Sequence, residues 1–179
     1  PAVLIGSHLD SVAQGGNFDG AAGVVSGLTA LAALKDAGIT PTSDVTVMGI
    51  RAEESAWFGV SYLGSRAALG MLPKGALDAK RSDTGRSLAD HIAECGGDPE
   101  SLQGGPAILD TSLIRAFLEP HIEQGPVLVT SGETIGAVTS VQSQNLFEIE
   151  IFGEEAHAGT TPRANRSDAV LAAVELISR

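Results

Sequence analysis

The sequence predicts an α/β protein with a mainly parallel sheet flanked by helices, followed by the start of a smaller α+β unit. Short apolar runs rich in β-branched residues predict the strands, and helical spacing of the apolar residues between them predicts the helices. Strands that alternate with helices usually form a parallel sheet with helices on its faces. A change of pattern near residue 134, where apolar and acidic residues begin to alternate, predicts the second unit.

The elements of the first unit follow in order along the chain. Residues 2–5 are the first expected strand, bounded by Gly6. Residues 20–37 are expected to be helical, with Lys35 in the last turn and Gly38 just past the end. The other expected elements are a strand at 45–50, short helices at 61–69 and 87–95, and a loop at 96–106.

The second unit is expected to contain antiparallel strands and a helix. Residues 147–151 alternate apolar and acidic side chains, which predicts a strand with one face in water, and 134–141 is its expected partner. Ser167 is the expected cap of a helix whose apolar residues, from Ala169 to Ile177, share one side.

We therefore predict two incomplete domains. Residues 1–134 form the first and 135–179 the second. Because the chain opens directly on an apolar strand and closes inside a helical pattern, we expect it to be a piece of a longer protein.

Composition narrows the classes of function. The formal net charge of −11 argues against a nucleic-acid partner, which needs clustered Lys and Arg, and against an anionic membrane. No apolar run approaches the roughly 18 residues of a membrane span. Cys95 is the single cysteine, which excludes an internal disulfide and fits a reducing compartment. We expect a cytoplasmic protein without a membrane or nucleic-acid partner.

Polar residues follow the expected strands, where ligands gather in parallel sheets. In His8-Leu9-Asp10, an extended backbone points the two polar side chains the same way, so Asp10 can accept from a ring N–H and hold its tautomer. The alternative is a surface pair without a role. Asp19, among glycines, can bind metal or simply cap the helix that follows.

Further polar residues suggest hydrolytic chemistry. Glu53 and Glu54 end the second strand, and dinuclear hydrolysis needs one carboxylate on a metal and one free to take a proton. The alternative is a solvated acidic turn. His121 is either a metal ligand or a loop histidine. His157 lies in a loop of the second unit, and His91 is interpreted as a surface residue with no role.

Four motifs occur in one order: GSHLDSVAQGGNFDGAAGVVSG, the EE pair of RAEESAWFG, PHIEQGPVL and HAGTTP. Together they resemble the N-carbamoyl-L-amino-acid hydrolase, allantoate amidohydrolase and beta-ureidopropionase group of the M20-type dinuclear amidohydrolases and peptidases. The resemblance runs from Gly6 to Ala169. HIEQG and HAGTTP distinguish this branch from the aminopeptidases and deacylases of the superfamily.

The resemblance implies a site with two divalent metal ions in each full-length subunit. It implies His8 and His121 as ligands of the first ion, Asp19 as the bridging carboxylate and Glu54 as a ligand of the second ion. Zn or Mn is expected, with Co or Ni as alternatives.

The remaining site roles also come from the resemblance. It implies Glu53 as general base, Asp10 as the orienting carboxylate and Gln124 as a substrate contact. His157 is the implied histidine that binds the substrate and polarises its carbonyl as the oxyanion develops. Arg166 belongs to the same motif and is expected to be structural.

The sequence departs from the group at three points. Arg163 stands where Met is usual, and residues 143–145 are Ser-Gln-Asn where Gly-Gln-Arg is frequent, which leaves substrate choice open. The group's last metal-binding histidine and its arginine for the substrate carboxylate have no counterpart before Arg179. We therefore expect an incomplete second metal site in this chain.

The function expected from this resemblance is metal-dependent hydrolysis of the carbamoyl (ureido) C–N bond of N-carbamoyl-L-amino acids or a related compound such as allantoate. One alternative is a dipeptidase or N-acyl amino-acid deacylase of the same superfamily, and another is a truncated, non-catalytic ligand-binding fragment. The resemblance also implies that 1–134 is a catalytic metal-binding α/β domain and that 135–179 is the beginning of a dimerisation or lid domain, with a hinge near 133–136. A homodimer through the second domain is the assembly that it implies.

Overall fold

The computed structural model describes residues 1–143 and 145–178. Gln144 and Arg179, both discussed above, lie outside the described residues. The chain divides into two compact units, Pro1–Thr134 and Ile135–Arg179, each of which is considered by itself. This division falls at the residue where the sequence pattern changes.

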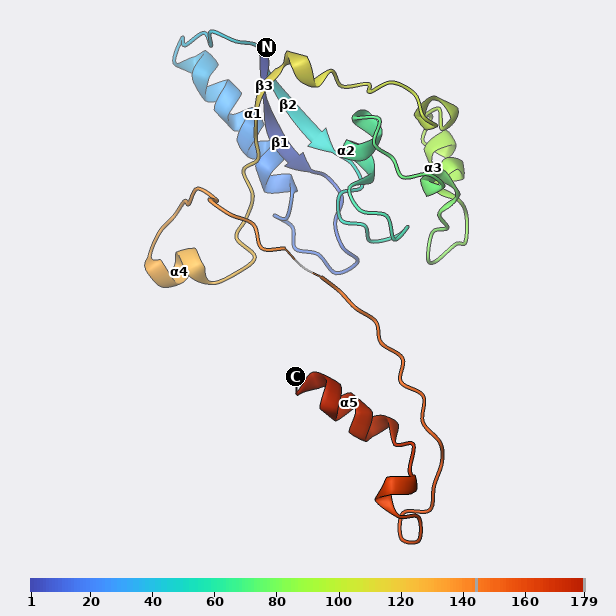
Figure 1. Cartoon of the computed structure of the whole chain (residues 1–179). Helices are drawn as coiled ribbons and strands as arrows, with labels where there is room; N and C mark the ends of the chain where they lie inside the picture. Colours follow the sequence, from blue (N-terminus) through green and yellow to red (C-terminus); the bar gives the residue numbers. More distant parts are fainter. Residues whose placement is uncertain (144, 179) are drawn as a thin grey trace. The chain divides into compact units, whose positions relative to one another are not determined.

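The first unit is built on a three-stranded sheet of order β2-β1-β3 with parallel pairing throughout (Figure 1). Its strands are β1 (Ala2–His8), β2 (Val45–Ile50) and β3 (Ile114–Leu118). The predicted parallel α/β fold is therefore confirmed. β1 is longer than predicted because Gly6 to His8 continue the ladder against the end of β2, and this extension places His8 at the carboxyl edge.

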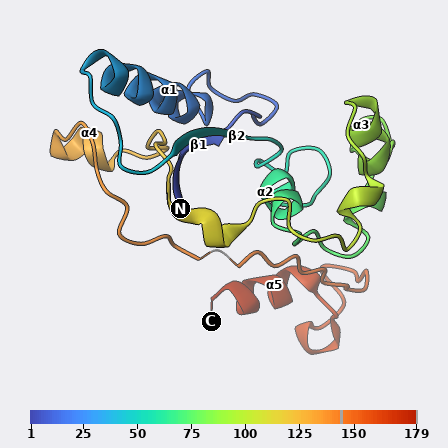
Figure 2. The same cartoon turned by 90° about the horizontal axis from the view of Figure 1, so that it is seen from above.

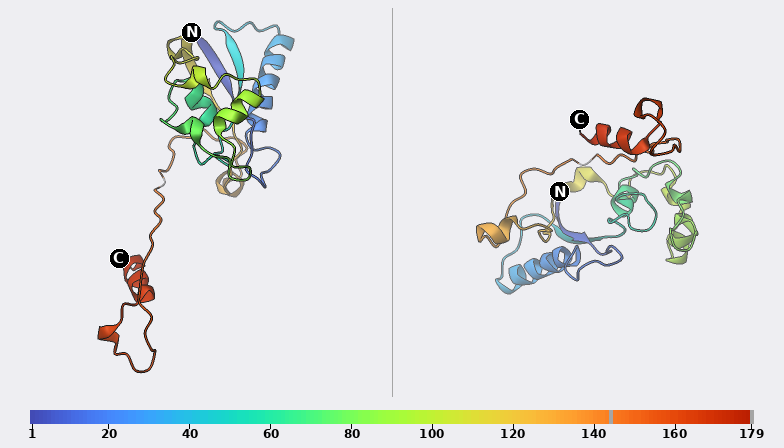
Figure 3. Two further views of the ribbon diagram at one scale, coloured as in Figure 1. Left: turned by 90° about the vertical axis from the view of Figure 1, so that its right-hand side faces the viewer. Right: turned by 90° about the horizontal axis from the view of Figure 1, so that it is seen from below.

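The helices confirm most of the sequence pattern. α1 (Ala21–Asp36) ends where Gly38 takes a positive φ, as expected, and it lies along one face of the sheet (Figures 1 and 2). α2 (Leu63–Ala68) and α3 (Leu88–Glu94) lie apart from α1, as the right-hand view of Figure 3 shows. The structure adds α4 (Val127–Ser131) and short 3-10 turns at Ala76–Asp78, Glu100–Leu102, Thr111–Leu113 and Arg163–Asn165.

Two local features stabilise the region around α3. Ser87 accepts a hydrogen bond from the Asp90 N–H while the Asp90 carboxylate accepts from the Ser87 N–H, which forms a capping box. Leu63 of α2 and Leu88 of α3 pack with Leu77 in a buried apolar cluster. No helix among the described residues has both the length and the apolarity needed to cross a bilayer.

α1 closely approaches the chain that follows β3. A Cβ atom built on Gly23 would overlap the carbonyl oxygen of Pro120, so only glycine fits at this point of the helix. Beside it, the fully buried Ser7 donates a hydrogen bond of 2.8 Å from its Oγ to Glu119. These contacts fix the start of the segment that carries His121 against β1 and α1.

The second unit corrects part of the prediction. Its helix, α5 (Ala169–Ile177), is present, but Asp168 rather than Ser167 caps it, because the Asp168 carboxylate accepts from the N–H groups of Val170 and Leu171.

The strands predicted at 134–141 and 147–151 do not form among the described residues. Side chains on both faces of these two segments are exposed to solvent. Phe147 and Ile149, for example, are 84% and 60% exposed. A two-stranded ribbon is marginal in water without a further strand or helix over its apolar face, which accounts for the extended conformation.

Gly23→Ala tests the close approach of α1. A Gly to Ala change inside a helix normally stabilises by up to about 1 kcal/mol. Here overlap with the Pro120 carbonyl should reverse the sign and lower the free energy of unfolding by about 1–3 kcal/mol. Gly16→Ala is the matched control, since no atom lies within 4 Å of the position that its Cβ would take. Equal unfolding midpoints for both variants in urea would contradict the packing.

Candidate metal centre

Three side chains from separate segments converge at the carboxyl edge of the sheet. His8 ends β1, Asp19 precedes α1, and His121 follows β3. His8 Nε2 lies 3.3 Å from His121 Nε2, and Asp19 Oδ1 lies 3.4 Å and 3.1 Å from these two nitrogens. The predicted ligands of the first metal therefore meet at one point, although 113 residues separate the two histidines.

The backbone sets the tautomer of both histidines. His8 Nδ1 lies 2.9 Å from the carbonyl oxygen of Asp10, and His121 Nδ1 lies 2.8 Å from that of Ile122. A carbonyl accepts only, so each Nδ1 carries the proton and each Nε2 keeps a lone pair. Metal-binding histidines are commonly held in this way.

Asp19 supplies the third donor atom. Its Oδ1 is buried and has no hydrogen-bond partner among the described residues. The alternative role as a helix cap is excluded, because Gly20 is the N-cap and no side chain caps α1. Gly20 has a φ of +64°, and a Cβ there would overlap His8.

The donor set fits a divalent cation. With both rings neutral and protonated at Nδ1, two imidazole lone pairs and one carboxylate oxygen face one another at 3.1–3.4 Å. Such an arrangement is repulsive unless a positive charge lies among the donors, and nitrogen and carboxylate donors suit Zn²⁺ or Mn²⁺.

The other oxygen of Asp19 is occupied. Gln124 donates a hydrogen bond of 2.7 Å from Nε2 to Asp19 Oδ2. In this structure Gln124, the predicted substrate contact, thus fixes the orientation of the Asp19 carboxylate. A bridge between two ions through both oxygens of Asp19 stays a prediction, and it is compatible with this hydrogen bond because Oδ2 keeps a second lone pair.

Asp10 orients the site differently from the expected way. Its backbone carbonyl, and not its carboxylate, holds the His8 ring, since Asp10 Oδ1 lies 3.9 Å from His8 Nδ1. The Asp10 carboxylate instead accepts from the N–H groups of Glu53 and Glu54, at 2.9 Å and 3.0 Å. Successive N–H groups that converge in this way form an anion-binding nest.

The loop around the acidic pair is strained. Ala52 and Ser55, on either side of the pair, have backbone φ angles of +54° and +58°. Residues other than glycine rarely adopt such positive values. Strain of this kind persists where surrounding bonds over-determine the conformation. The two hydrogen bonds to Asp10 provide that constraint.

The acidic pair lies close to His8. One oxygen of Glu53, one of Glu54 and a ring nitrogen of His8 lie within 4.8 Å of one another, so the predicted second-metal ligand and the predicted base share this edge. Burial raises the pKa of Glu53 above its ordinary value. The positive charge of a protonated His8 opposes this shift, while the nearby negative charges, first that of Glu54, add to it.

His8 responds to the same charges. Burial acts to lower its pKa, but the hydrogen bond to the Asp10 carbonyl and the negative charges of Glu53, Asp10 and Glu54 raise it overall. The negative charges at this edge therefore favour a positive charge at His8.

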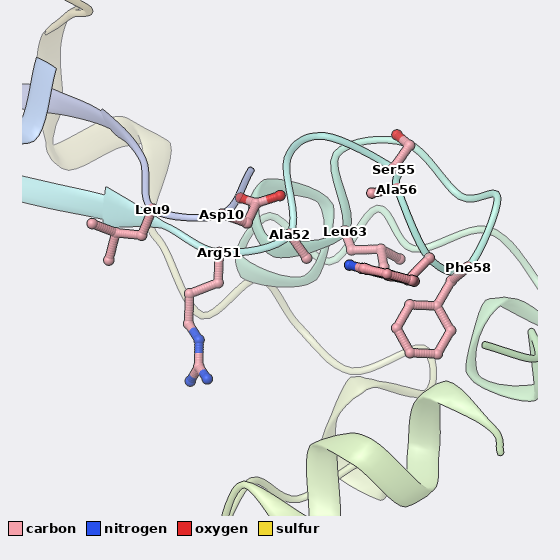
Figure 4. A pocket seen from close by; sticks show the side chains of 9 residues that line it. Leu9, Asp10, Arg51, Ala52, Ser55, Ala56, Phe58 and Leu63 are labelled. Atoms are coloured by element: carbon pink, nitrogen blue, oxygen red, sulfur yellow. The ribbon is translucent and has the colours of Figure 1, made fainter. Parts of the chain in front are cut away.

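A cavity of about 320 Å³ lies beside this loop. Asp10 forms part of its wall, Phe58 and Leu63 supply apolar surface, and Arg51 extends away from Asp10 (Figure 4). Apolar hollows that adjoin a few polar groups are typical binding places for small molecules.

The remaining sequence-predicted residues lie elsewhere. His157 belongs to the second unit, where its ring is engaged by its own turn. His91 is less exposed than expected: its ring meets the edge of Phe58 at 5.7 Å between centroids, and its Nε2 is buried.

Sequence reasoning missed Ser7 and Glu119. Their hydrogen bond joins the ends of β1 and β3, and the charge of Glu119 contributes to the raised pKa of Glu53. A hydroxyl in an otherwise apolar strand needs a polar partner, and this was the available signal for Ser7. The nonlocal partner itself carried no pattern in the sequence.

Fold and site together define a class of protein, namely an α/β domain with a candidate metal centre at the carboxyl edge of a parallel sheet. Within this class the chain belongs to peptidase family M20/M25/M40, whose family model matches residues 4–179. This family is metal-dependent, in agreement with the donor set described above. The resemblance found in the four motifs is confirmed.

Individual relatives agree with this assignment. The chain is 38% identical over 175 residues to an N-carbamoyl-L-amino acid amidohydrolase of Geobacillus stearothermophilus, with 98% of this chain and 42% of that protein covered. It is 36% identical over 174 residues to an allantoate amidohydrolase of Escherichia coli K12, with 95% of this chain and 40% of that protein covered.

A solved structure agrees with the family assignment. A hydantoinase/carbamoylase family amidase from Burkholderia ambifaria matches with a TM-score of 0.71 and 35% identity, over 99% of this chain and 42% of that one. The chain thus spans about two fifths of the length of the proteins it matches.

Asp10→Asn tests the connection between the two loops. The asparagine side chain has a single accepting oxygen. The N–H of either Glu53 or Glu54 would therefore face the side-chain NH2 group and lose its hydrogen bond. We expect the free energy of unfolding to fall by about 1–3 kcal/mol. Asp98→Asn is the matched control, because among the described residues the Asp98 side chain accepts a hydrogen bond from the local N–H of Glu100 alone. Equal effects in both variants by urea denaturation would contradict the role of Asp10.

Asp19→Asn tests the metal centre. Removal of one negative donor between two histidine nitrogens should weaken Zn²⁺ binding by about tenfold or more in isothermal titration calorimetry. Asp36→Asn, at the exposed end of α1, should leave the affinity unchanged. An unchanged affinity in Asp19→Asn would exclude this carboxylate from the centre.

Proposed function

We propose that the protein containing this chain hydrolyses the carbamoyl (ureido) C–N bond of N-carbamoyl-L-amino acids or of a related ureido compound such as allantoate. The observation that carries the proposal is the convergence of His8, His121 and Asp19 on one point beside Glu53 and Glu54. The names of the relatives, which are amidohydrolases of these compounds, support the substrate class.

The residues present would hold the metal in a definite way. His8, His121 and Asp19 would bind one divalent ion, and Glu54 would bind a second. Such ions supply a Lewis acid for the carbonyl and lower the pKa of a water molecule towards neutrality. The identity of the ions, Zn or Mn first and Co or Ni next, and their number are part of the proposal.

Glu53 is the proposed general base. Its raised pKa makes its carboxylate a stronger base than an ordinary glutamate. It takes a proton from water as the water oxygen bonds to the carbonyl carbon, and it returns the proton to the leaving nitrogen as the C–N bond breaks. When the leaving nitrogen is that of the amino acid, an N-carbamoyl amino acid yields the amino acid and carbamic acid, which decomposes to carbon dioxide and ammonia.

Other residues orient the reactants. Asp10 fixes the loop that carries Glu53 through the N–H groups of the acidic pair. Gln124 is proposed to contact substrate in addition to its bond with Asp19. His157 is proposed to donate to the carbonyl oxygen as negative charge develops there.

A second candidate activity follows from the family. The family is named for peptidases, and this favours a dipeptidase or N-acyl amino-acid deacylase as the alternative to a carbamoyl hydrolase. Turnover of a panel of carbamoyl, acyl and peptidyl amino acids by the complete protein separates the two. Metal binding without turnover of any member would favour a ligand-binding fragment.

We further infer that the second unit pairs with a second copy of itself. α5 exposes an apolar stripe of Val170, Val174 and Ile177, which are 71%, 57% and 85% exposed and follow helical spacing. Exposed apolar faces of this kind commonly form two-fold interfaces.

The expected assembly is a homodimer. Light scattering on the complete protein at micromolar concentration should give twice the chain mass, and Val174→Asp should give the mass of one chain. Asp36→Asn is again the control. A monomer in the unaltered protein would reject the inference.

Glu53→Gln tests the mechanism in the complete protein. Glutamine preserves size but cannot take a proton, so kcat for a carbamoyl amino acid should fall by about 10²–10⁴-fold. Bound metal, measured by elemental analysis, should remain, because Glu53 is the base and not a proposed ligand.

Glu100→Gln serves as the matched control on an exposed turn. Full activity in Glu53→Gln would eliminate this residue as the base. Loss of metal together with activity would instead reassign it as a ligand.

A further inference from the structure

The turn that carries His157 has an internal order that the metal centre does not explain. The N–H groups of Gly159 and Thr160 both point at His157 Nδ1, each at 3.1 Å. The N–H of Thr161 donates to the carbonyl of His157 at 3.2 Å and closes the turn. The histidine ring is therefore folded back over its own backbone.

These contacts determine where the proton of the ring lies. Two N–H donors at Nδ1 require a lone pair there, so a neutral His157 carries its proton on Nε2. Within the described residues Nε2 has no hydrogen-bond partner. The side chain thus presents one N–H donor outward, fixed in direction by the turn.

Arg166 holds this turn together. Its Nε donates to the carbonyl of Thr161 at 2.8 Å, and its Nη2 donates to the carbonyl of Ala158 at 2.6 Å. One planar guanidinium thereby fixes two carbonyls on either side of the N–H pair. Arg163, in the adjacent 3-10 turn, makes no such contact among the described residues.

We propose that Arg166 is a positioning residue, which acts through residues 157–161 to hold His157 as the Nε2–H tautomer with its donor facing outward. This inference rests on the proposed function, in which that donor meets the substrate carbonyl oxygen. Arg166 itself does not touch the substrate. The ordinary alternative is that Arg166 only stabilises the fold of the second unit.

The first test is spectroscopic and independent of activity. The complete protein is labelled with ¹⁵N-histidine, and His157→Gln assigns the His157 signals in long-range ¹H–¹⁵N spectra. We expect unprotonated Nδ1 and protonated Nε2 in the unaltered protein. Arg166→Gln should give exchange-averaged shifts of the two tautomers, while Arg163→Gln should leave the spectrum unchanged.

The second test is kinetic. Arg166→Gln should lower kcat by about tenfold with KM and metal content little changed, because a misplaced donor weakens stabilisation of the transition state. His157→Gln should lower kcat by about 10²–10³-fold, the usual effect of losing one such donor. Arg166→Lys, which keeps the charge but not the planar fork, should resemble Arg166→Gln.

The outcomes separate the two proposals. A proton on Nδ1, or a His157 spectrum that Arg166→Gln does not alter, overturns the positioning role whatever the activity. The expected spectra with undiminished turnover in His157→Gln overturn the proposed catalytic part of His157 and leave the tautomer intact. Equal thermal denaturation midpoints of Arg166→Gln and Arg163→Gln, beside different kcat values, exclude a purely structural role.

Discussion

The candidate site depends on the carboxylate of Asp10. This one side chain connects the loop after β1 with the loop after β2, because it accepts both N–H groups of the acidic pair. The backbone carbonyl of the same residue orients His8. A single residue therefore positions a proposed metal ligand and the proposed base together.

Close packing at the far side of the centre complements this link. Gly23 lets α1 touch the carbonyl of Pro120, and the Ser7–Glu119 hydrogen bond joins the ends of the neighbouring strands. His121 follows immediately and is brought to 3.3 Å from His8. Parallel strands deliver their ends to one edge, but these contacts between backbone and buried side chains set the distances at which donors meet.

The sequence predicted the elements whose signal is local. Hydrophobic spacing identified α1 and β2, and the family resemblance implied that His8, Asp19 and His121 bind one metal ion. β3 was missed, because a five-residue strand with Arg115 near its start shows little periodicity. The strands expected in the second unit failed for a different reason, since alternation describes the faces of a strand and supplies no pairing partner.

Side-chain roles were harder to predict than positions. Asp10 was expected to orient a ring with its carboxylate, yet its carbonyl does so, and Gln124 binds Asp19 through an amide that no spacing rule places. Such details depend on which of two polar groups of a residue reaches the nearer partner. They are set by the fold as a whole.

The histidines show how the backbone can assign opposite chemistry to one side-chain type. At His8 and His121 a carbonyl faces Nδ1, so the proton lies there and Nε2 offers a lone pair. At His157 two N–H groups face Nδ1, so Nε2 bears the proton and becomes a donor. A lone pair suits a cation and an N–H suits an oxyanion. The peptide groups beside each ring thus separate the two proposed metal-binding histidines from the histidine proposed to face the substrate, without any difference in the side chain.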